Sequence, residues 1–101
     1  MRSFETFKRA MLSNPAVKKE YDALEEEFAL IRALLAARTR AKLTQAQVAR
    51  RMGTSQSAVA RMESGRSLPS MSSLRKYAHA TGSTVEIRLP KAKPARKRRA
   101  R

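Results

Sequence analysis

Apolar residues recur at helical spacing along the first 39 residues of the chain. Three of them, spaced three and four apart, predict a short helix that ends before an Asn-Pro pair: Phe4, Phe7 and Met11. Asn14 is a favourable N-cap, and Pro15 suits the first helical position because its missing N–H has no partner there in any case. A second and longer helix is therefore predicted over residues 15–39.

The long helix carries a seam of apolar residues that are separated by alternating steps of four and three: Val17, Tyr21, Leu24, Phe28, Ile31 and Leu35. Such spacing over nearly three heptads is typical either of a coiled coil or of a stripe that faces a core. The run is short for an autonomous coiled coil, and Leu30 and Leu34 widen it on one flank. We therefore interpret the seam as core-facing, although its acidic first half can project beyond the core.

A capping box predicts the start of the next helix. Thr44 precedes a helical run and Gln47 follows three residues later, so that each side chain can satisfy a backbone N–H of the first turn. This helix is predicted to run from Gln45 to about Met52. Gly53 then stands where a tight turn needs a residue in the left-handed conformation.

A second short helix follows this turn: Ser55 caps it, and it runs to about Ser64 before Gly65 stops it. In a unit that starts at Gln45, the fifth, ninth and fifteenth positions are Ala49, Gly53 and Val59. Two helices that cross near a right angle need a small residue at closest approach, a turn residue that tolerates positive φ, and an apolar contact that fixes the angle. The spacing therefore predicts a helix-turn-helix.

The rest of the chain predicts one more helix and one strand. Ser70 caps a helix that Gly82 ends, and residues 83–89 then alternate between apolar and polar up to Pro90. A lone strand leaves its backbone groups unpaired, and no second strand is evident in the sequence, so the segment needs a partner in another molecule. We favour antiparallel pairing with the same segment of a second copy; addition to the sheet of a partner protein is the alternative.

The charge divides the chain into parts. The 101 residues hold 23 Lys and Arg against 8 Asp and Glu, and the net charge of +15 indicates a polyanionic partner, either nucleic acid or an anionic membrane surface. Residues 1–30 carry 5 basic and 6 acidic groups, residues 31–90 carry 11 and 2, and residues 91–101 carry 7 and none. The last part has almost nothing apolar to bury and is predicted to be a disordered basic tail.

Composition also excludes several classes of chemistry. The chain has no cysteine and a single histidine, His79, so we expect no metal site, no cofactor and no enzymatic activity. The sequence has no apolar run near the roughly 20 residues of a membrane span and no apolar signal-peptide core, so we expect a cytoplasmic protein. An RNA-binding protein or nucleic-acid enzyme is disfavoured because the basic region lacks aromatic stacking surfaces and a carboxylate cluster.

The segment TQAQVARRMGTSQSAVARMESGRSLPSMSSLRKYAHATG resembles the Cro/phage-repressor (Xre) family of helix-turn-helix proteins, and the resemblance covers about residues 31–82. The flanks, with FETFK near the N-terminus and EIRL near the C-terminus, resemble HigA-type antitoxins. The resemblance implies a mainly α fold: a five-helix Xre-like domain with an N-terminal helical extension and one C-terminal β-strand. The expected organisation is an extension at 1–30, a DNA-binding domain at 31–82, a dimerisation strand at 83–90 and the tail at 91–101.

The function that this resemblance implies has two parts. A homodimer binds an inverted repeat in double-stranded operator DNA and represses its own operon, and the same protein neutralises a small RelE/HigB-like toxin that cleaves mRNA. The alternative is a stand-alone Xre-family repressor without a toxin partner. A toxin gene next to this one would distinguish the two.

The resemblance also assigns site residues. Four are expected to read base edges in the major groove: Ser55, Gln56, Ser57 and Arg61. Four others are expected to hold phosphates: Thr44, Gln45, Arg51 and Arg66. The expected structural residues are Arg38, Ala49, Gly53, Val59 and Glu63. Among these, Arg38 and Glu63 match the residue types of a buried ion pair in phage repressors.

An acidic stretch in the long helix is the candidate docking surface for the toxin, because a toxin that holds RNA must itself be basic. The stretch contains no basic residue, and its acidic residues are Glu20, Asp22, Glu25, Glu26 and Glu27. The alternative is that these carboxylates are ordinary solvated charges on the surface of a helix.

Overall fold

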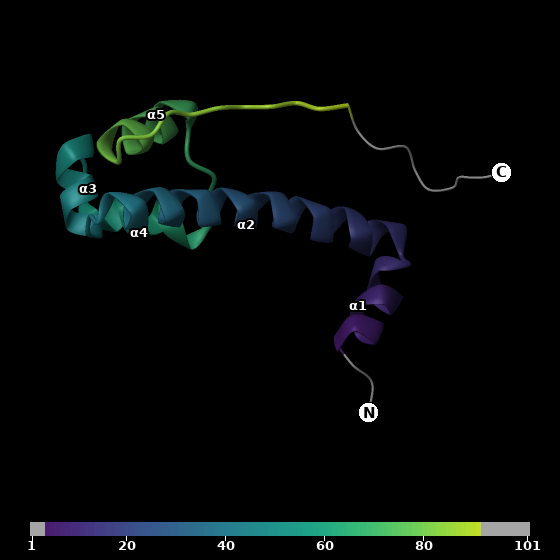
Figure 1. Cartoon of the computed structure of the whole chain (residues 1–101). Helices are drawn as coiled ribbons and strands as arrows, with labels where there is room; N and C mark the ends of the chain where they lie inside the picture. The colour runs from purple at the N-terminus through teal and green to yellow at the C-terminus, as the bar shows by residue number, and fades with distance from the viewer. Residues whose placement is uncertain (1–3, 92–101) are drawn as a thin grey trace.

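The computed structural model describes residues 4–91, and these form five helices with no β-strand. The helices are α1 (Phe4–Leu12), α2 (Pro15–Ala41), α3 (Gln45–Met52), α4 (Gln56–Ser64) and α5 (Met71–Ala80), arranged as Figure 1 shows. The predicted mainly α, five-helix fold is confirmed. No helix within these residues is long and apolar enough to cross a membrane.

The helix starts predicted from the sequence hold their predicted bonds. The hydroxyl of Thr44 accepts the backbone N–H of Gln47 at 3.1 Å. The side-chain oxygen Oε1 of Gln47 accepts the backbone N–H of Thr44 at 2.8 Å, so the capping box is complete. The Asn14 side chain accepts a backbone N–H at the start of α2. Ser55 and Ser70 do the same at α4 and α5, with N···O distances of 3.1 Å.

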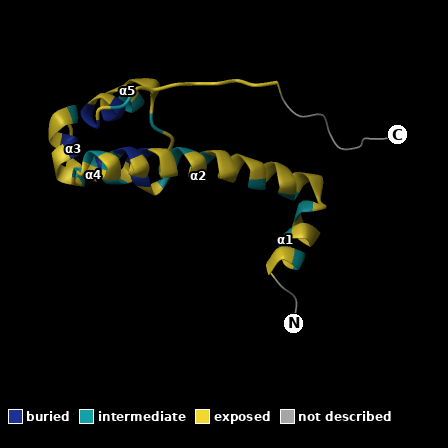
Figure 2. Cartoon of the chain, in the orientation of Figure 1, coloured by how far each residue is buried: buried dark blue, intermediate teal, exposed yellow. Residues whose placement is uncertain are grey.

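The core lies between the C-terminal half of α2 and the three helices α3, α4 and α5 (Figure 2). Tyr77, Val48 and Val59 are its largest fully buried side chains. α2 has 27 residues and is about 40 Å long, and its buried residues are Leu34 and Ala37. The N-terminal half of α2, together with α1, therefore extends away from the core.

The seam of α2 does not face the core, and this prediction is wrong. Leu34 is 6% exposed, whereas Leu24, Phe28 and Leu35 are 48%, 49% and 36% exposed. At about 100° per residue, Leu30 and Leu34 lie more than a quarter of a turn away from the seam, and the core is on their side of the helix. The flanking leucines thus supply the core contact, and most of the seam remains on the surface.

The segment after α5 also differs from the prediction. Residues 83–90 follow α5 without regular secondary structure, and they run as an extended segment in Figure 1. A β-strand is defined by hydrogen bonds to a neighbouring strand, and residues 4–91 supply no second strand. Pairing with another molecule stays a prediction. Of the predicted basic tail, residues 92–101 lie outside the described part of the chain.

Candidate DNA-binding surface

The turn between α3 and α4 is built on a left-handed glycine. Gly53 has a φ of +74° and caps α3, while the N–H of Thr54 donates to the carbonyl of Ala49 at 2.9 Å. A Cβ atom at Gly53 would meet nothing within 4 Å, so the backbone conformation, not space, favours glycine here. Ala49 is 3% exposed and Val59 is fully buried, which is the close packing that the helix-turn-helix spacing requires.

A bidentate ion pair joins α2 to α4. Arg38 donates from Nε to Glu63 Oε2 at 2.8 Å and from Nη2 to Glu63 Oε1 at 3.0 Å. The side chain of Glu63 is 4% exposed and that of Arg38 is 22% exposed. The Tyr77 hydroxyl lies 2.6 Å from Glu63 Oε2 and 2.8 Å from the carbonyl oxygen of Leu34, so its one proton is shared between two acceptors. The carboxylate of Glu63 is therefore held from α2 and from α5.

These contacts shift the titration of the three groups. Burial raises the pKa of Glu63, but hydrogen bonds from Arg38, Tyr77 and Gln45 outweigh burial, and the pKa lies below its ordinary value. The hydrogen bond to Glu63 raises the pKa of Arg38. Burial and the hydrogen bond to Glu63 raise the pKa of Tyr77. At neutral pH Glu63 is thus ionised and can only accept hydrogen bonds.

The carboxylate of Glu63 also reaches the first helix of the motif. Gln45 Nε2 donates to Glu63 Oε1 at 2.9 Å, and Gln56 Nε2 donates to Gln45 Oε1 at 3.4 Å. An ionised carboxylate has no proton to give, so the amide nitrogen of Gln45 must face Glu63 and its oxygen must face Gln56. A chain of hydrogen bonds therefore runs from the core to the N-terminus of α4.

The residues expected to read bases lie on or beside the exposed face of α4. Gln56, Ser57 and Arg61 are all exposed. Ser55 is also exposed, but its hydroxyl already accepts the N–H of Ala58 and lies 3.2 Å from the hydroxyl of Ser57. The cap therefore restrains the side chain of Ser55, whereas the side chain of Gln56 reaches Gln45 on α3.

The residues expected to hold phosphates lie in three places. Thr44 and Gln45 lie together at the N-terminus of α3, close to Gln56. Arg66 is exposed just after α4. Arg51 lies elsewhere on α3: its Nη1 donates to the carbonyl oxygen of Ala80 at 3.0 Å and joins α3 to the end of α5. This bond gives Arg51 a packing role that the sequence did not indicate.

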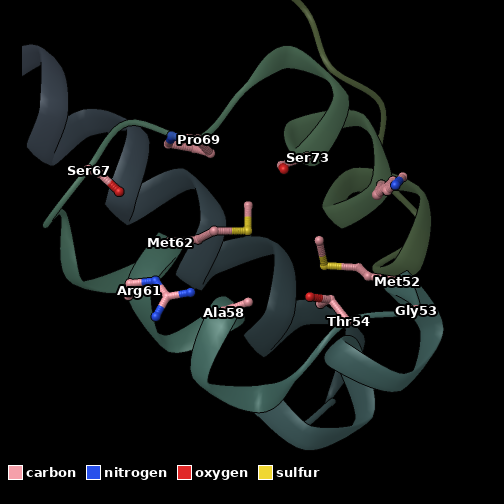
Figure 3. Close-up of a pocket in the computed structure, with 10 residues that line it drawn as sticks. Met52, Gly53, Thr54, Ala58, Arg61, Met62, Ser67, Pro69 and Ser73 are labelled. Atoms are coloured by element: carbon pink, nitrogen blue, oxygen red, sulfur yellow. The ribbon is translucent and has the colours of Figure 1, made fainter.

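A hollow of about 300 Å³ lies beside α4, between the turn after α3, the loop before α5 and α5 itself (Figure 3). Arg61 and Lys76 supply positive charge to its lining, and Ser67 and Ser73 supply hydroxyl groups. The guanidinium of Arg61 is therefore placed at the border between the exposed face of α4 and the loop that follows it. Within residues 4–91 no three His, Cys, Asp or Glu side chains are grouped to hold a metal ion.

Tyr77 is the site residue that sequence reasoning missed. The cap at Ser70 and the stop at Gly82 locate its helix, but they indicate no polar partner for the Tyr77 hydroxyl. A buried tyrosine hydroxyl requires a polar partner. This requirement is the signal from which a buried carboxylate or carbonyl near Tyr77 could have been expected. The structure supplies both partners, in Glu63 and in the carbonyl of Leu34.

Comparison with known proteins agrees with this geometry. The sequence profile of the helix-turn-helix family matches residues 34–87, which include α3, α4 and α5. The chain belongs to the helix-turn-helix family. It is similar to Antitoxin HigA1 of Mycobacterium tuberculosis (strain CDC 1551 / Oshkosh), with 35% identity over 78 residues, which cover 77% of this chain and 52% of that protein.

Antitoxin HigA1 of Mycobacterium tuberculosis (strain ATCC 25618 / H37Rv) gives the same identity and coverage. The chain therefore spans about half the length of these relatives. No solved structure matches the chain significantly. The predicted resemblance to HigA-like helix-turn-helix proteins is thus confirmed.

Proposed function

We propose that this protein is a HigA-type antitoxin that binds operator DNA as a homodimer, represses its own operon, and neutralises a RelE/HigB-like toxin that cleaves mRNA. The observation that carries the DNA-binding half is the hydrogen-bonded chain from Glu63 through Gln45 to Gln56, at the exposed end of α4. In a helix-turn-helix protein this end of the second helix enters the major groove.

The chain of hydrogen bonds presents one specific pattern to DNA. Gln56 gives one N–H to Gln45 and keeps its second N–H and its carbonyl oxygen. That remaining donor and acceptor match N7 and the N6 amino group of adenine. Because Glu63 fixes the amide of Gln45, and Gln45 engages the amide of Gln56, the reading side chain is oriented before DNA arrives.

Other residues would supply the remaining contacts. Arg61, one turn further along α4, can address O6 and N7 of guanine. The N-terminus of α3 at Gln45 can hold a phosphate with backbone N–H groups, and Arg66 can contact the neighbouring backbone. A two-fold pairing through residues 83–89 would set two α4 helices against the two halves of an inverted repeat.

Two observations support the toxin partner. The relatives that match the chain over 77% of its length carry the name Antitoxin HigA1. The acidic stretch over residues 20–27 lies on the half of α2 that extends from the core, where a protein partner can reach it. A stand-alone repressor is the second candidate, because the family match covers only residues 34–87 and does not include this extension.

Copurification tests both halves of the proposal. The chain is expressed with the product of the adjacent gene, and the purified complex is then footprinted on the DNA upstream of the operon. We expect a stable complex and protection of an inverted repeat. Protection of DNA without any copurifying toxin would favour the stand-alone repressor, and no protection would contradict the proposed DNA-binding function.

A further inference from the structure

The seam of α2 is contacted at Tyr21 and at Ile31 and is open between these two residues. At the N-terminal end, the ammonium group of Lys8 on α1 lies 4.9 Å from the centre of the Tyr21 ring. At the other end, Ile31 contacts the C-cap of α4, where a Cβ atom on Gly65 would lie 2.6 Å from Ile31 Cδ1. Between these contacts Leu24 and Phe28, one helical turn apart, are 48% and 49% exposed.

The open part of the seam lies between its contact with α1 and its contact with the C-terminal end of α4. In Figure 1, α1 leaves the end of α2 at a steep angle, on the side of α2 where α4 lies. Both helices contact seam residues, so the open part of the seam faces the space between them. α1 contributes three more exposed apolar side chains, with exposures of 69%, 54% and 36%: Phe4, Phe7 and Met11. Exposed apolar side chains therefore occur both on α1 and on the open part of the seam.

The acidic stretch divides into two faces relative to this seam. At about 100° per residue, Glu20, Glu25 and Glu27 lie within a quarter of a turn of it, and they flank it on both sides. Asp22 and Glu26 lie more than a third of a turn away, and Asp22 pairs with Lys18 at 2.8 Å. An apolar centre with an acidic border fits a partner whose apolar side chains are bordered by lysine or arginine.

A second copy of the chain fits this surface poorly. The seam runs from residue 17 to residue 35, so the axis of a two-fold pairing through its middle passes near residue 26. Glu25 and Glu27 would then face the same glutamates of the other copy, and such like charges repel. The 83–87 segment lies on a different face of α2, where Arg40 Nη2 donates to the Ser83 hydroxyl at 3.1 Å. Dimerisation through that segment leaves the seam free.

We propose that the seam surface, formed by Leu24 and Phe28 with Glu20, Glu25 and Glu27 at its border, is the docking site for an amphipathic helix of a basic, RNA-binding partner protein. The alternating steps of three and four along the seam suit a helix that packs its side chains into the gaps between them. This inference rests on the proposed antitoxin function, because the toxin is the basic partner that this function requires.

The test uses the 101-residue chain and the purified product of the adjacent gene, with affinity measured by titration calorimetry. The variant Phe28→Ala removes an exposed side chain that makes no core contact, so we expect a tenfold or greater rise in Kd for the toxin. The double variant Glu20→Lys with Glu27→Lys is also expected to weaken binding. Its matched control, Asp22→Lys with Glu26→Lys, changes the net charge equally and is expected to leave Kd within about twofold.

Affinity for operator DNA is measured for every variant, and we expect it to stay unchanged. An unchanged affinity would show that the helix-turn-helix remains folded. An unchanged Kd for Phe28→Ala, or equal losses in the two charge variants, would overturn the proposal. A seam variant that lowers the sedimentation mass of the free chain while toxin affinity stays constant would assign the surface to a second copy. If the wild-type chain binds no toxin at all, the proposed antitoxin function fails, and the docking proposal fails with it.

Discussion

Glu63 accepts a hydrogen bond from Gln45 at 2.9 Å, and this bond connects the buried ion pair of the domain to its candidate DNA-binding surface. The carboxylate is 4% exposed and also bonds Arg38 and Tyr77, so three helices hold it in place. A group that stabilises the core thereby also fixes the orientation of a side chain beside the N-terminus of α4.

Removing one partner of the ion pair should lower the free energy of unfolding more than replacing both partners with apolar residues. Glu63→Ala leaves the Arg38 guanidinium partly buried without its carboxylate, and we expect a loss of about 3 kcal/mol in the free energy of unfolding. The double variant Arg38→Met with Glu63→Leu should lose less, because Tyr77 keeps the carbonyl of Leu34 as an acceptor. Urea denaturation measures both values. If the losses of the single variants Arg38→Met and Glu63→Leu add up to the loss of the double variant, the pairing is contradicted.

The same carboxylate predicts an acid limb of stability. The pKa of Glu63 lies below its ordinary value of 4.5 in the folded chain, so the unfolded chain takes up the proton first as the pH falls. The stabilisation is therefore fully present above pH 4.5 and is lost as the pH falls through the folded pKa. Denaturation of wild type and Glu63→Gln between pH 7 and pH 3 should show the difference between them shrinking on acidification. A constant difference would mean that Glu63 does not titrate in this way.

The two left-handed glycines at the ends of α3 and α4 predict unequal costs. Gly53 and Gly65 have φ angles of +74° and +77°, so alanine at either is strained by roughly 1 kcal/mol. At Gly65 the new Cβ would also lie 2.6 Å from Ile31 Cδ1, whereas at Gly53 it meets nothing within 4 Å. Thermal denaturation should therefore show the larger loss for Gly65→Ala. Equal losses would show that Ile31 moves aside at little cost.

Substitution of a proposed base reader should change DNA binding in a different way from substitution of a proposed phosphate contact. Gln56→Ala should relax the preference for particular base pairs, at a cost of about 1–3 kcal/mol on the best site. Arg66→Ala should weaken binding to all sequences alike and reduce the salt dependence by about one counterion. Binding to a library of single-base operator variants at two salt concentrations separates the two patterns. Uniform weakening by Gln56→Ala would contradict its assignment as a base reader.

Local signals made most of the fold predictable. The capping box at Thr44, the caps at Ser55 and Ser70, and the glycine at position 53 each act within a few residues, and the structure shows all of them in place. The ion pair of Arg38 and Glu63 was expected from family resemblance, since nothing in the local sequence joins residues 25 positions apart. The sequence pattern alone was therefore sufficient to predict those features whose contacts join residues close together in the chain.

The predictions that were wrong or incomplete share a different cause. Each concerns a segment whose structure depends on the element that packs against it. The spacing of the α2 seam is the same whether the helix faces a core or a partner, and only the positions of α3, α4 and α5 show that Leu34 is buried and Phe28 exposed. The segment from Ser83 to Leu89 has the alternation of a strand, but a strand needs a second strand that residues 4–91 do not contain. Tyr77 in the Glu63 network required knowledge of two helices at once.

We propose that Gln56, held by Gln45 and Glu63, gives this chain its choice of DNA site, and DNA affinities of a Gln45 variant test this role. Fluorescence anisotropy gives the affinity of wild type and of Gln45→Ala for the upstream operator and for random DNA of equal length. We expect the wild type to prefer the operator by at least about a thousandfold. We also expect Gln45→Ala to lose much of that preference while its affinity for random DNA changes far less. A wild-type chain with equal affinity for both DNAs, or a variant whose preference is intact, would contradict this role of Gln56.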